Sequence, residues 1–314
     1  MQNSKVVIVG TGLVGMSYGY ALVNQGTIEE LILIDIDRDK AEGEAMDLNH
    51  GLAFAPRKMN ISAGDYSECK DAGLVVITAG VNQKEGETRI QLLTRNAAII
   101  KTVVKNIMAS GFNGILLVAS NPVDILAYVT WKESGMPHSR VIGSGTSLDT
   151  ARLRYEISSI INIDSRNVHA YILGEHGDSE FVCWSNANIG AKPMQDVINS
   201  MGEISFADLD KIYNKVRNSA YEIIKRKKAT YYGVGMALVR ITAAIFNNEN
   251  RIMPISVLNN GTYECEEKVY IGLPAVLNKD GVHHIVKLEL NDEEKRKLRH
   301  SATILRDNLD SINY

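Results

Sequence analysis

The sequence predicts an α/β fold in which a doubly wound parallel sheet is followed by an α+β domain. In the first half of the 314-residue chain, short runs rich in Val, Ile and Leu alternate with amphipathic stretches such as 89–110. Parallel strands that are covered by helices on both faces have this pattern. In the second half, long helical patterns precede a β region with turn signals, which indicates a second architecture.

Six apolar runs in the first half have the length and composition of buried strands. We expect right-handed crossovers to join them into one parallel sheet. They are KVVIVG (5–10), ELILIDI (30–36), MNIS (59–62), LVVITAG (74–80), GILLVAS (114–120) and RVIGSG (140–145).

The second half contains one further strand-like run, two long helical patterns, a β region and a charged helix at the end. The β region carries the turn signals NNG and NKDG, and the last helix has Asn291 as a plausible N-cap. The expected ranges are 167–178 for the strand, 205–228 and 230–250 for the helices, and 253–289 for the β region.

Composition excludes several classes of protein. Hydrophobic residues make up 45% of the chain, charged residues make up 23%, and the net charge is −3. These values are ordinary for a globular protein and unlike those of a nucleic-acid-binding surface. The start MQNSKVVIVG has no signal-peptide pattern, and no apolar run approaches the roughly 20 residues that span a bilayer. We therefore expect a cytoplasmic protein with no nucleic-acid or membrane partner.

The sequence predicts no metal site. The three cysteines are scattered and form no CxxC pair, which fits a reducing compartment, and there is no HExxH motif. His283 and His284 are neighbours and should therefore point to opposite faces of a strand.

The stretch GTGLVG (10–15) follows the first strand and opens a helix, and Asp35 ends the next strand about twenty residues later. This is the dinucleotide fingerprint of a Rossmann domain. Gly10 allows the tight turn, Gly12 lets a pyrophosphate approach the backbone, and Gly15 lets the helix pack on the strand. Asp35 can accept a hydrogen bond from a ribose 2′-hydroxyl, and with Asp37 nearby it would repel a 2′-phosphate. The cofactor is therefore predicted to be NAD. We divide the chain into a NAD-binding Rossmann domain, 1–145, and a substrate-binding catalytic domain, 146–314.

Hydride transfer to and from an alcohol carbon needs a proton-transfer group, a donor that polarises the carbonyl, and a cation for any carboxylate. The sequence offers a candidate for each role. The loop VNQKEGETR (81–89) and the turn SNPVD (120–124) follow predicted strands, where ligands bind in open α/β sheets. Asp149 and Arg152 are three residues apart on a predicted helix and share one face. His176 lies in LGEHGDSE, between acids.

Taken in order, the motifs GTGLVG, NQKEGETR, ASNPVD, LDTARLRY and GEHGD closely resemble those of the L-lactate dehydrogenases, in the bacterial form. The resemblance covers nearly the whole chain and extends to TYYGVGMALVRI and the C-terminal LNDEEKRKLRHSA. It implies reversible, NAD-dependent reduction of pyruvate to (S)-lactate in fermentative glycolysis.

The resemblance also implies a role for each motif residue. His176 would be the proton shuttle and Asp149 its orienting carboxylate. Arg152 would clamp the substrate carboxylate, and Arg89 would polarise the carbonyl from a mobile loop. Further substrate contacts are expected from Gln83, Asn121 and Thr230, and cofactor contacts from Gly10, Gly12, Val14, Gly15, Asp35, Lys40, Tyr66, Gly80, Val81, Ser120 and Asn121. One departure is Glu85, where many relatives carry Pro.

Two alternatives remain open at this point. Malate dehydrogenase shares the fold and the His/Asp/Arg set but carries an Arg in the loop, where this chain has the neutral Gln83. A second carboxylate beside Gln83 would be buried without a countercharge, which favours pyruvate and lactate. A catalytically silent Rossmann protein is the other alternative. It would lack at least one of His176, Arg89 and Arg152, and this chain has all three.

Arg154 and His169 form a second Arg/His set. Arg154 lies two helical steps from Arg152 and so points elsewhere, and in a regular strand His169 and His176 would lie on opposite faces. The resemblance implies that this set binds fructose 1,6-bisphosphate between subunits of a homotetramer. The plain alternative is a surface arginine and a hydrogen-bonded histidine.

Overall fold

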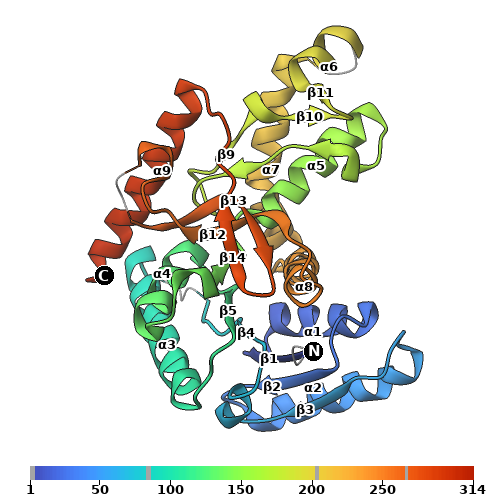
Figure 1. Ribbon diagram of the computed structural model, residues 1–314, viewed down its shortest axis with the longest axis vertical. Coiled ribbons are helices and arrows are strands. Elements are labelled where there is room, and N and C mark those ends of the chain that lie inside the picture. Colours follow the sequence, from blue (N-terminus) through green and yellow to red (C-terminus); the bar gives the residue numbers. More distant parts are fainter. Residues whose placement is uncertain (1–3, 83–85, 202–204, 266–267) are drawn as a thin grey trace.

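The computed structural model describes residues 4–82, 86–201, 205–265 and 268–314. They form the predicted α/β fold (Figure 1), in which nine strands make one sheet in the order β14-β13-β12-β6-β5-β4-β1-β2-β3. The part from β3 to β6 is parallel and has the order of a dinucleotide-binding sheet.

All six strands expected in the first half are present, and their side chains are almost entirely buried except in β3. They are β1 (Lys5–Val9), β2 (Glu30–Ile34), β3 (Asn60–Ala63), β4 (Leu74–Ile77), β5 (Ile115–Val118) and β6 (Val141–Gly143). The helices that cross between them are α1 (Leu13–Gln25), α2 (Arg38–Gly51), α3 (Arg89–Ala109) and α4 (Val123–Ser134).

The β region of the second half continues the same sheet. Strands β12 (Arg251–Leu258), β13 (Tyr270–Asn278) and β14 (Gly281–Ile285) run antiparallel, and Ser256 of β12 pairs with Gly143 of β6. The sheet therefore passes the boundary that we propose near residue 145. Helix α8 (Tyr232–Phe246) also packs closely on α1.

A second group of elements lies beside the large sheet (Figure 1), and Gly174 after β8 bridges to Gly272 of β13. Many of its apolar side chains form their own cluster, which includes Leu153, Ile157, Val168 and Val216, while Leu173 and Phe181 belong to the main core. The elements are α5 (Ser147–Ile161), β7 (Val168–His169), β8 (Ile172–Leu173), β9 (Phe181–Val182), β10 (Asn188–Ile189), β11 (Lys192–Pro193), α6 (Met194–Met201) and α7 (Phe206–Lys227).

The prediction of one strand over 167–178 is wrong. The stretch contains β7 and β8, which pair with different partners: β7 with β10, and β8 with β9. Between them, the carbonyl of Ala170 accepts a hydrogen bond from Nε of Arg154 at 3.2 Å instead of from a strand. His169 and His176 therefore do not lie on opposite faces of one strand, because His176 lies in the loop after β8.

The expectation for His283 and His284 is also wrong. The register of β13 against β14 shifts between Val276, which pairs with His284, and Leu277, which pairs with Val282, so β14 has a bulge at His283. A bulge turns successive side chains out of strict alternation. The Nδ1 atoms of the two exposed histidines are consequently 2.6 Å apart.

Helix α9 (Asp292–Ser311) begins where the sequence predicts. Asn291 is its N-cap and accepts the N–H of Glu294, whose side chain in turn accepts the N–H of Asn291. Helices α7 and α8 likewise fall within their expected ranges. Among the described residues, no helix combines the length and apolar composition needed to cross a bilayer.

Candidate active site

The glycine-rich turn between β1 and α1 has the geometry that the fingerprint predicts. Gly10 has φ +107°, and a Cβ there would lie 2.7 Å from the backbone N of Ala79. A Cβ at Gly15 would lie 2.1 Å from the carbonyl O of Gly10. Gly12, the N-cap of α1, has open space where a Cβ would be. The free N–H groups at the start of α1 therefore face an accessible cradle, which fits a dinucleotide pyrophosphate.

Asp35 at the end of β2 is held by this turn. Its carboxylate accepts the N–H of Thr11 at 2.7 Å, the hydroxyl of Thr11 at 2.8 Å and the N–H of Asp37 at 3.1 Å. Burial opposes ionisation, but these hydrogen bonds and the nearby Lys40 hold the pKa of Asp35 below its ordinary value. Asp35 is thus a fixed acceptor beside the turn, while Asp37 caps α2.

Most of the other predicted cofactor residues follow the carboxyl ends of β3, β4 and β5. The Ser120 hydroxyl donates to the Ala79 carbonyl at 2.6 Å, and the N–H of Val81 donates to Asn96 at 3.0 Å. The Ser120 bond joins the ends of β4 and β5, where a dinucleotide binds in this kind of sheet, and the Val81 bond joins the end of β4 to α3. Gly80 and Val81 are exposed after β4, and Asn121 follows Ser120 after β5. Tyr66 is half-buried after β3. Val14 and Lys40 lie in the first turns of α1 and α2.

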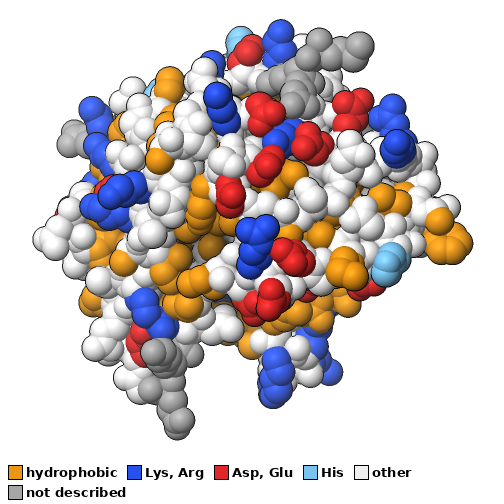
Figure 2. Space-filling model, turned by 90° about the horizontal axis from the view of Figure 1, so that it is seen from below, with side chains coloured by type: hydrophobic (Ala, Val, Ile, Leu, Met, Phe, Trp, Pro, Cys, Tyr) orange, Lys and Arg blue, Asp and Glu red, His pale blue; other side chains and the backbone are white. Residues whose placement is uncertain are grey.

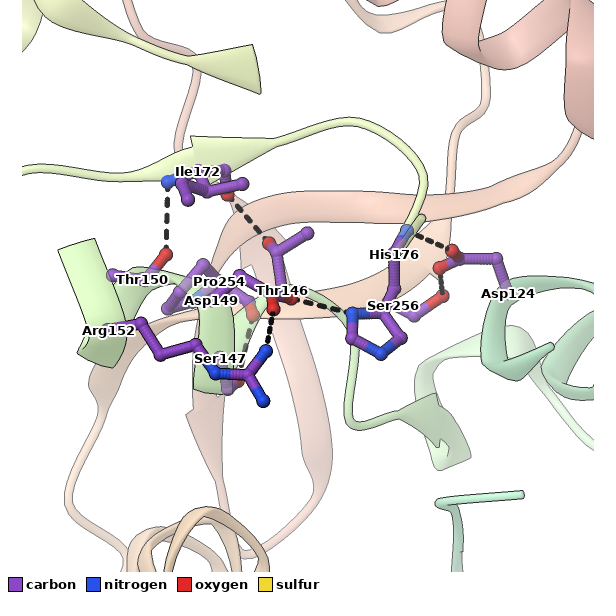
Figure 3. A network of polar contacts seen from close by, with 10 residues as sticks. All are labelled: Asp124, Thr146, Ser147, Asp149, Thr150, Arg152, Ile172, His176, Pro254 and Ser256. Carbon is purple, nitrogen blue, oxygen red and sulfur yellow. Dashed lines mark hydrogen bonds and ion pairs between the residues drawn. The ribbon is translucent and has the colours of Figure 1, made fainter. Parts of the chain in front are cut away.

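Three predicted site residues meet at the start of α5 (Figure 3). Nδ1 of His176 is 2.6 Å from Asp149 Oδ2, and Nη1 of Arg152 donates to Asp149 Oδ1 at 2.8 Å. The helical spacing of Asp149 and Arg152 places both side chains on one face, and the loop after β8 brings His176 to them. We call Asp149, Arg152 and His176 the catalytic cluster.

The electrostatics of the cluster favour a charged imidazole. Burial by itself favours the neutral ring, but Asp149, Asp124 and Glu180 outweigh it and raise the pKa of His176 to about 9. Burial also opposes ionisation of Asp149, yet His176 and Arg152 hold the pKa of that carboxyl below its ordinary value. His176 keeps 25% of its side chain exposed, so the ring remains accessible.

Asp124, in the predicted turn SNPVD, has a role that its motif does not indicate. Asp124 of α4 is 2% exposed; its Oδ2 accepts the main-chain N–H of His176 at 2.7 Å, and its Oδ1 accepts the hydroxyl of Ser256 at 2.5 Å (Figure 3). Burial raises the pKa of Asp124 to about 6, although Ser256 and the N–H of His176 favour its charged form. Asp124 therefore fixes the backbone of His176 from the first half of the chain.

A second missed residue is Glu180, which stands at the end of the motif LGEHGDSE. It is 4% exposed, and its carboxylate lies within 4.8 Å of the facing atoms of Asp149 and His176. Burial raises the pKa of Glu180 to about 9, with Asp149 adding to the shift and His176 and Arg152 opposing it. The sequence offered no signal for this proximity, because an acid after a loop is usually exposed.

Arg89 and Thr230 do not contact the catalytic cluster. Arg89 begins α3, is 84% exposed and pairs with Asp178 at 3.6 Å, while Asp178 also accepts the hydroxyl of Tyr221 at 3.1 Å. Thr230 lies half-buried between α7 and α8. Arg89 and Asp178 line a cavity of about 710 Å³, together with residues of α4, α7 and α9. The predicted contact Gln83 lies outside the described residues, as does Glu85.

Arg154 lies on α5 two residues after Arg152, and His169 lies on β7, which packs against α5. Arg154 is half-buried, with its guanidinium carbon 5.4 Å from the ring centroid of Tyr171, and His169 is exposed on β7. Burial lowers the pKa of Arg154; Tyr171 opposes this shift, and the nearby Arg251 adds to it. Arg251 is therefore close to Arg154, and it also pairs with Glu249 at 3.8 Å.

A dinucleotide-binding sheet with a His–Asp–Arg cluster beside it defines the class, a dehydrogenase that uses a nicotinamide cofactor. Comparison with known proteins gives the family. Residues 4–143 match the lactate/malate dehydrogenase NAD binding domain, and residues 146–313 match the alpha/beta C-terminal domain of the same family. The chain belongs to the lactate/malate dehydrogenase family.

Individual relatives agree with this assignment. L-lactate dehydrogenase 2 of Bacillus cereus (strain ZK / E33L) is 54% identical over 306 residues, covering 98% of this chain and 97% of the relative. The crystal structure of MGS-M5, a lactate dehydrogenase enzyme from a Medee basin deep-sea metagenome library, is 82% identical, with a TM-score of 0.99 and full coverage of both chains. The ligands-bound minor L-lactate dehydrogenase of Enterococcus mundtii is 50% identical, with a TM-score of 0.97 and coverage of 100% and 99%.

Proposed function

We propose that this chain is an NAD-dependent L-lactate dehydrogenase that interconverts pyruvate and (S)-lactate. The observation that carries the proposal is the cluster in which Asp149 binds both His176 and Arg152. The relatives that match over nearly the full length are named lactate dehydrogenases, which supports the same reaction.

His176 transfers the proton in this proposal, while bound NADH supplies the hydride. Because Nδ1 is engaged by Asp149, the other ring nitrogen, Nε2, is the one that faces a substrate oxygen. The raised pKa of His176, about 9, keeps the imidazole protonated at neutral pH, as reduction of a carbonyl requires. Asp149 stabilises the imidazolium and fixes the orientation of the ring.

Arg152 binds the substrate carboxylate. A guanidinium carries five N–H donors in a planar fork, and only Nη1 is used by Asp149. The remaining donors can form the paired hydrogen bonds that a carboxylate accepts. Arg89 polarises the carbonyl once its side chain leaves Asp178, Asn121 holds the substrate or nicotinamide, and Thr230 lines the methyl side.

Pyruvate is preferred over oxaloacetate because Gln83 offers no positive charge for a second carboxylate. Malate dehydrogenase is the competing function, and the family includes both activities. The test is the ratio of kcat/KM for pyruvate to that for oxaloacetate, measured from NADH absorbance. We expect a ratio far above one in the wild type and a lower ratio in Gln83→Arg. A wild type that prefers oxaloacetate would make the chain a malate dehydrogenase.

The enzyme works in the cytoplasm as a homotetramer that fructose 1,6-bisphosphate activates. The half-buried Arg154 with Arg251 nearby supports an anion site beside His169. Large apolar side chains left exposed on α1, α2 and α8 support self-association, and hydrophobic side chains are visible among polar and charged ones on the face seen in Figure 2. They include Leu13, Tyr20, Met46, Tyr232 and Met236. The buried free thiols of Cys69, Cys183 and Cys265 fit a reducing compartment.

A further inference from the structure

The segment that ends in Glu180 holds this residue rigidly beside the catalytic cluster. Its carbonyl accepts the hydroxyl of Tyr213 from α7, and its N–H donates to the carbonyl of Gly177 at 3.3 Å. Both main-chain groups are thus tied before β9 begins. These contacts fix the main chain at Glu180, and the residue is only 4% exposed.

Charged groups from two helices face the Glu180 carboxyl. Asp149 and Arg152 approach from α5, and Arg217 acts on it from α7. Glu180 also lines the cavity of about 710 Å³, whereas Asp149 and His176 do not. Lys297 and His300 of α9 line the same cavity. Of Asp149, His176 and Glu180, only Glu180 therefore lies at the wall of this cavity.

We propose that Glu180 sets how firmly His176 holds its proton, and that Asp149, His176 and Glu180 bind and release protons as one unit. Glu180 does not touch the substrate; it acts through His176. This inference deepens the proposed lactate dehydrogenase reaction and rests on it for its catalytic meaning. The coupling between Glu180 and His176 itself does not depend on which substrate the enzyme uses.

The physical reason is the separation of at most 4.8 Å in a buried site. Two ionised carboxylates beside each other are unfavourable there, so Glu180 stays neutral while Asp149 is charged. As the pH rises, Glu180 begins to ionise, and the new carboxylate stabilises the neighbouring imidazolium. His176 then keeps its proton to higher pH than Asp149 and Asp124 alone would allow.

The consequence for reduction has a definite sign. Pyruvate reduction needs protonated His176, so the rate falls as the pH rises through the pKa of that group. Replacing Glu180 by an isosteric group without charge lowers this pKa. The midpoint of the alkaline fall in kcat/KM must therefore move to lower pH, and the fall must occur over a narrower range of pH.

The experiment compares the wild type with Glu180→Gln and Glu175→Gln. Glu175 lines the same cavity and is adjacent to His176, but its carboxylate is not part of the group formed by Asp149, His176 and Glu180. The titration of His176 is followed by NMR of the full-length protein with labelled histidine, and His176→Asn identifies the signal. In parallel, kcat/KM for pyruvate is measured as a function of pH.

We expect Glu180→Gln to lower the midpoint of His176 by about half a pH unit or more, and the alkaline limb with it. Glu175→Gln should leave both unchanged. Glu180→Asp keeps an ionisable group, should fall between the wild type and Glu180→Gln, and provides the test if the amide variant does not fold. An unchanged His176 midpoint in the Glu180 variants overturns the inference. Failure of the wild type to reduce pyruvate would reject the proposed function, while the NMR titration would still decide this inference.

Discussion

At the scale of single residues, buried carboxylates organise the site. Asp124 links three elements, because it holds the backbone of His176 and the side chain of Ser256 while belonging to α4. The Asp149 carboxylate contacts the side chains of both His176 and Arg152, at 2.6 and 2.8 Å. The orientation of His176 is therefore fixed by two acids from different halves of the chain.

The raised pKa of Asp124, about 6, makes a prediction for stability. The folded protein disfavours the ionised form of Asp124. Its contribution to the free energy of unfolding is therefore fully present below the unfolded pKa near 4, and it is lost as the pH rises to about 6. Relative to Asp124→Asn, the wild type should lose about 3 kcal/mol of unfolding free energy over this interval. Asn keeps both hydrogen bonds, with its oxygen toward His176 and its amide toward Ser256.

Denaturant titrations of the two proteins at pH 4, 5 and 6 measure this difference. Ser256→Ala serves as a control that leaves the carboxyl in place but removes one of its hydrogen bonds. A constant difference between wild type and Asp124→Asn across the interval would show that Asp124 is not the group that titrates.

The sequence could indicate some of these residues and not others. Asp149 and Arg152 share a helical face at fixed spacing, so their contact was predictable once the helix was recognised. The partner of Asp124, Ser256, is 132 positions away, and nothing in either motif signals the pairing. Glu180 was in the quoted motif, but its burial depends on Tyr213 and the packing of α7.

At the scale of elements, the turn between β1 and α1 depends on contacts that allow no side chain. Gly15→Ala would place Cβ at 2.1 Å from the Gly10 carbonyl. We expect a loss of about 1–3 kcal/mol in unfolding free energy and a Kd for NADH that rises at least about tenfold, because α1 must move away from the turn.

Gly43→Ala is the matched control, since Gly43 is exposed on α2 and a Cβ there meets nothing within 4 Å. It should stabilise the protein by up to about 1 kcal/mol and leave the NADH Kd unchanged. Equal effects of the two substitutions on NADH binding would contradict the assigned role of the turn.

The elements that were predicted well are those with strong local signals. The six parallel strands and the capped start of α9 follow from apolar runs and from Asn291. The run 167–178 failed because its break depends on Arg154 and on separate partner strands, which are tertiary features. The bulge beside His283 and His284 has the same kind of origin.

At the scale of the whole molecule, the large sheet joins both halves of the chain. Pairing of β12 with β6 places the C-terminal strands on the Rossmann sheet, while α5 to α7 and β7 to β11 form a separate layer. The catalytic cluster lies at this junction, since Asp124 belongs to one half and Asp149 and His176 to the other. Length and composition could not predict this division, because it depends on pairing over more than a hundred residues.

The proposed effector site is also a property of the assembly. We expect the pyruvate KM of the wild type to fall when fructose 1,6-bisphosphate is added, and Arg154→Gln to abolish the effect. Arg166→Gln is a suitable control, because Arg166 is an exposed cation nearby that pairs locally with Asp164. Steady-state kinetics and sedimentation measure the response. No binding in calorimetry and no change in KM would make the chain a non-allosteric member with an ordinary surface arginine.

In the proposed reaction His176, held by Asp149 and Asp124, transfers the proton to the substrate. The decisive measurement is kcat for pyruvate reduction together with the NADH Kd of His176→Asn, on the same preparation. Asn can still bind Asp149 but cannot carry a proton at neutral pH. We expect kcat of His176→Asn to fall by about 10²–10⁴-fold, while its NADH Kd stays within about twofold of the wild type. A kcat within a few-fold of the wild type, with intact NADH binding, would contradict it.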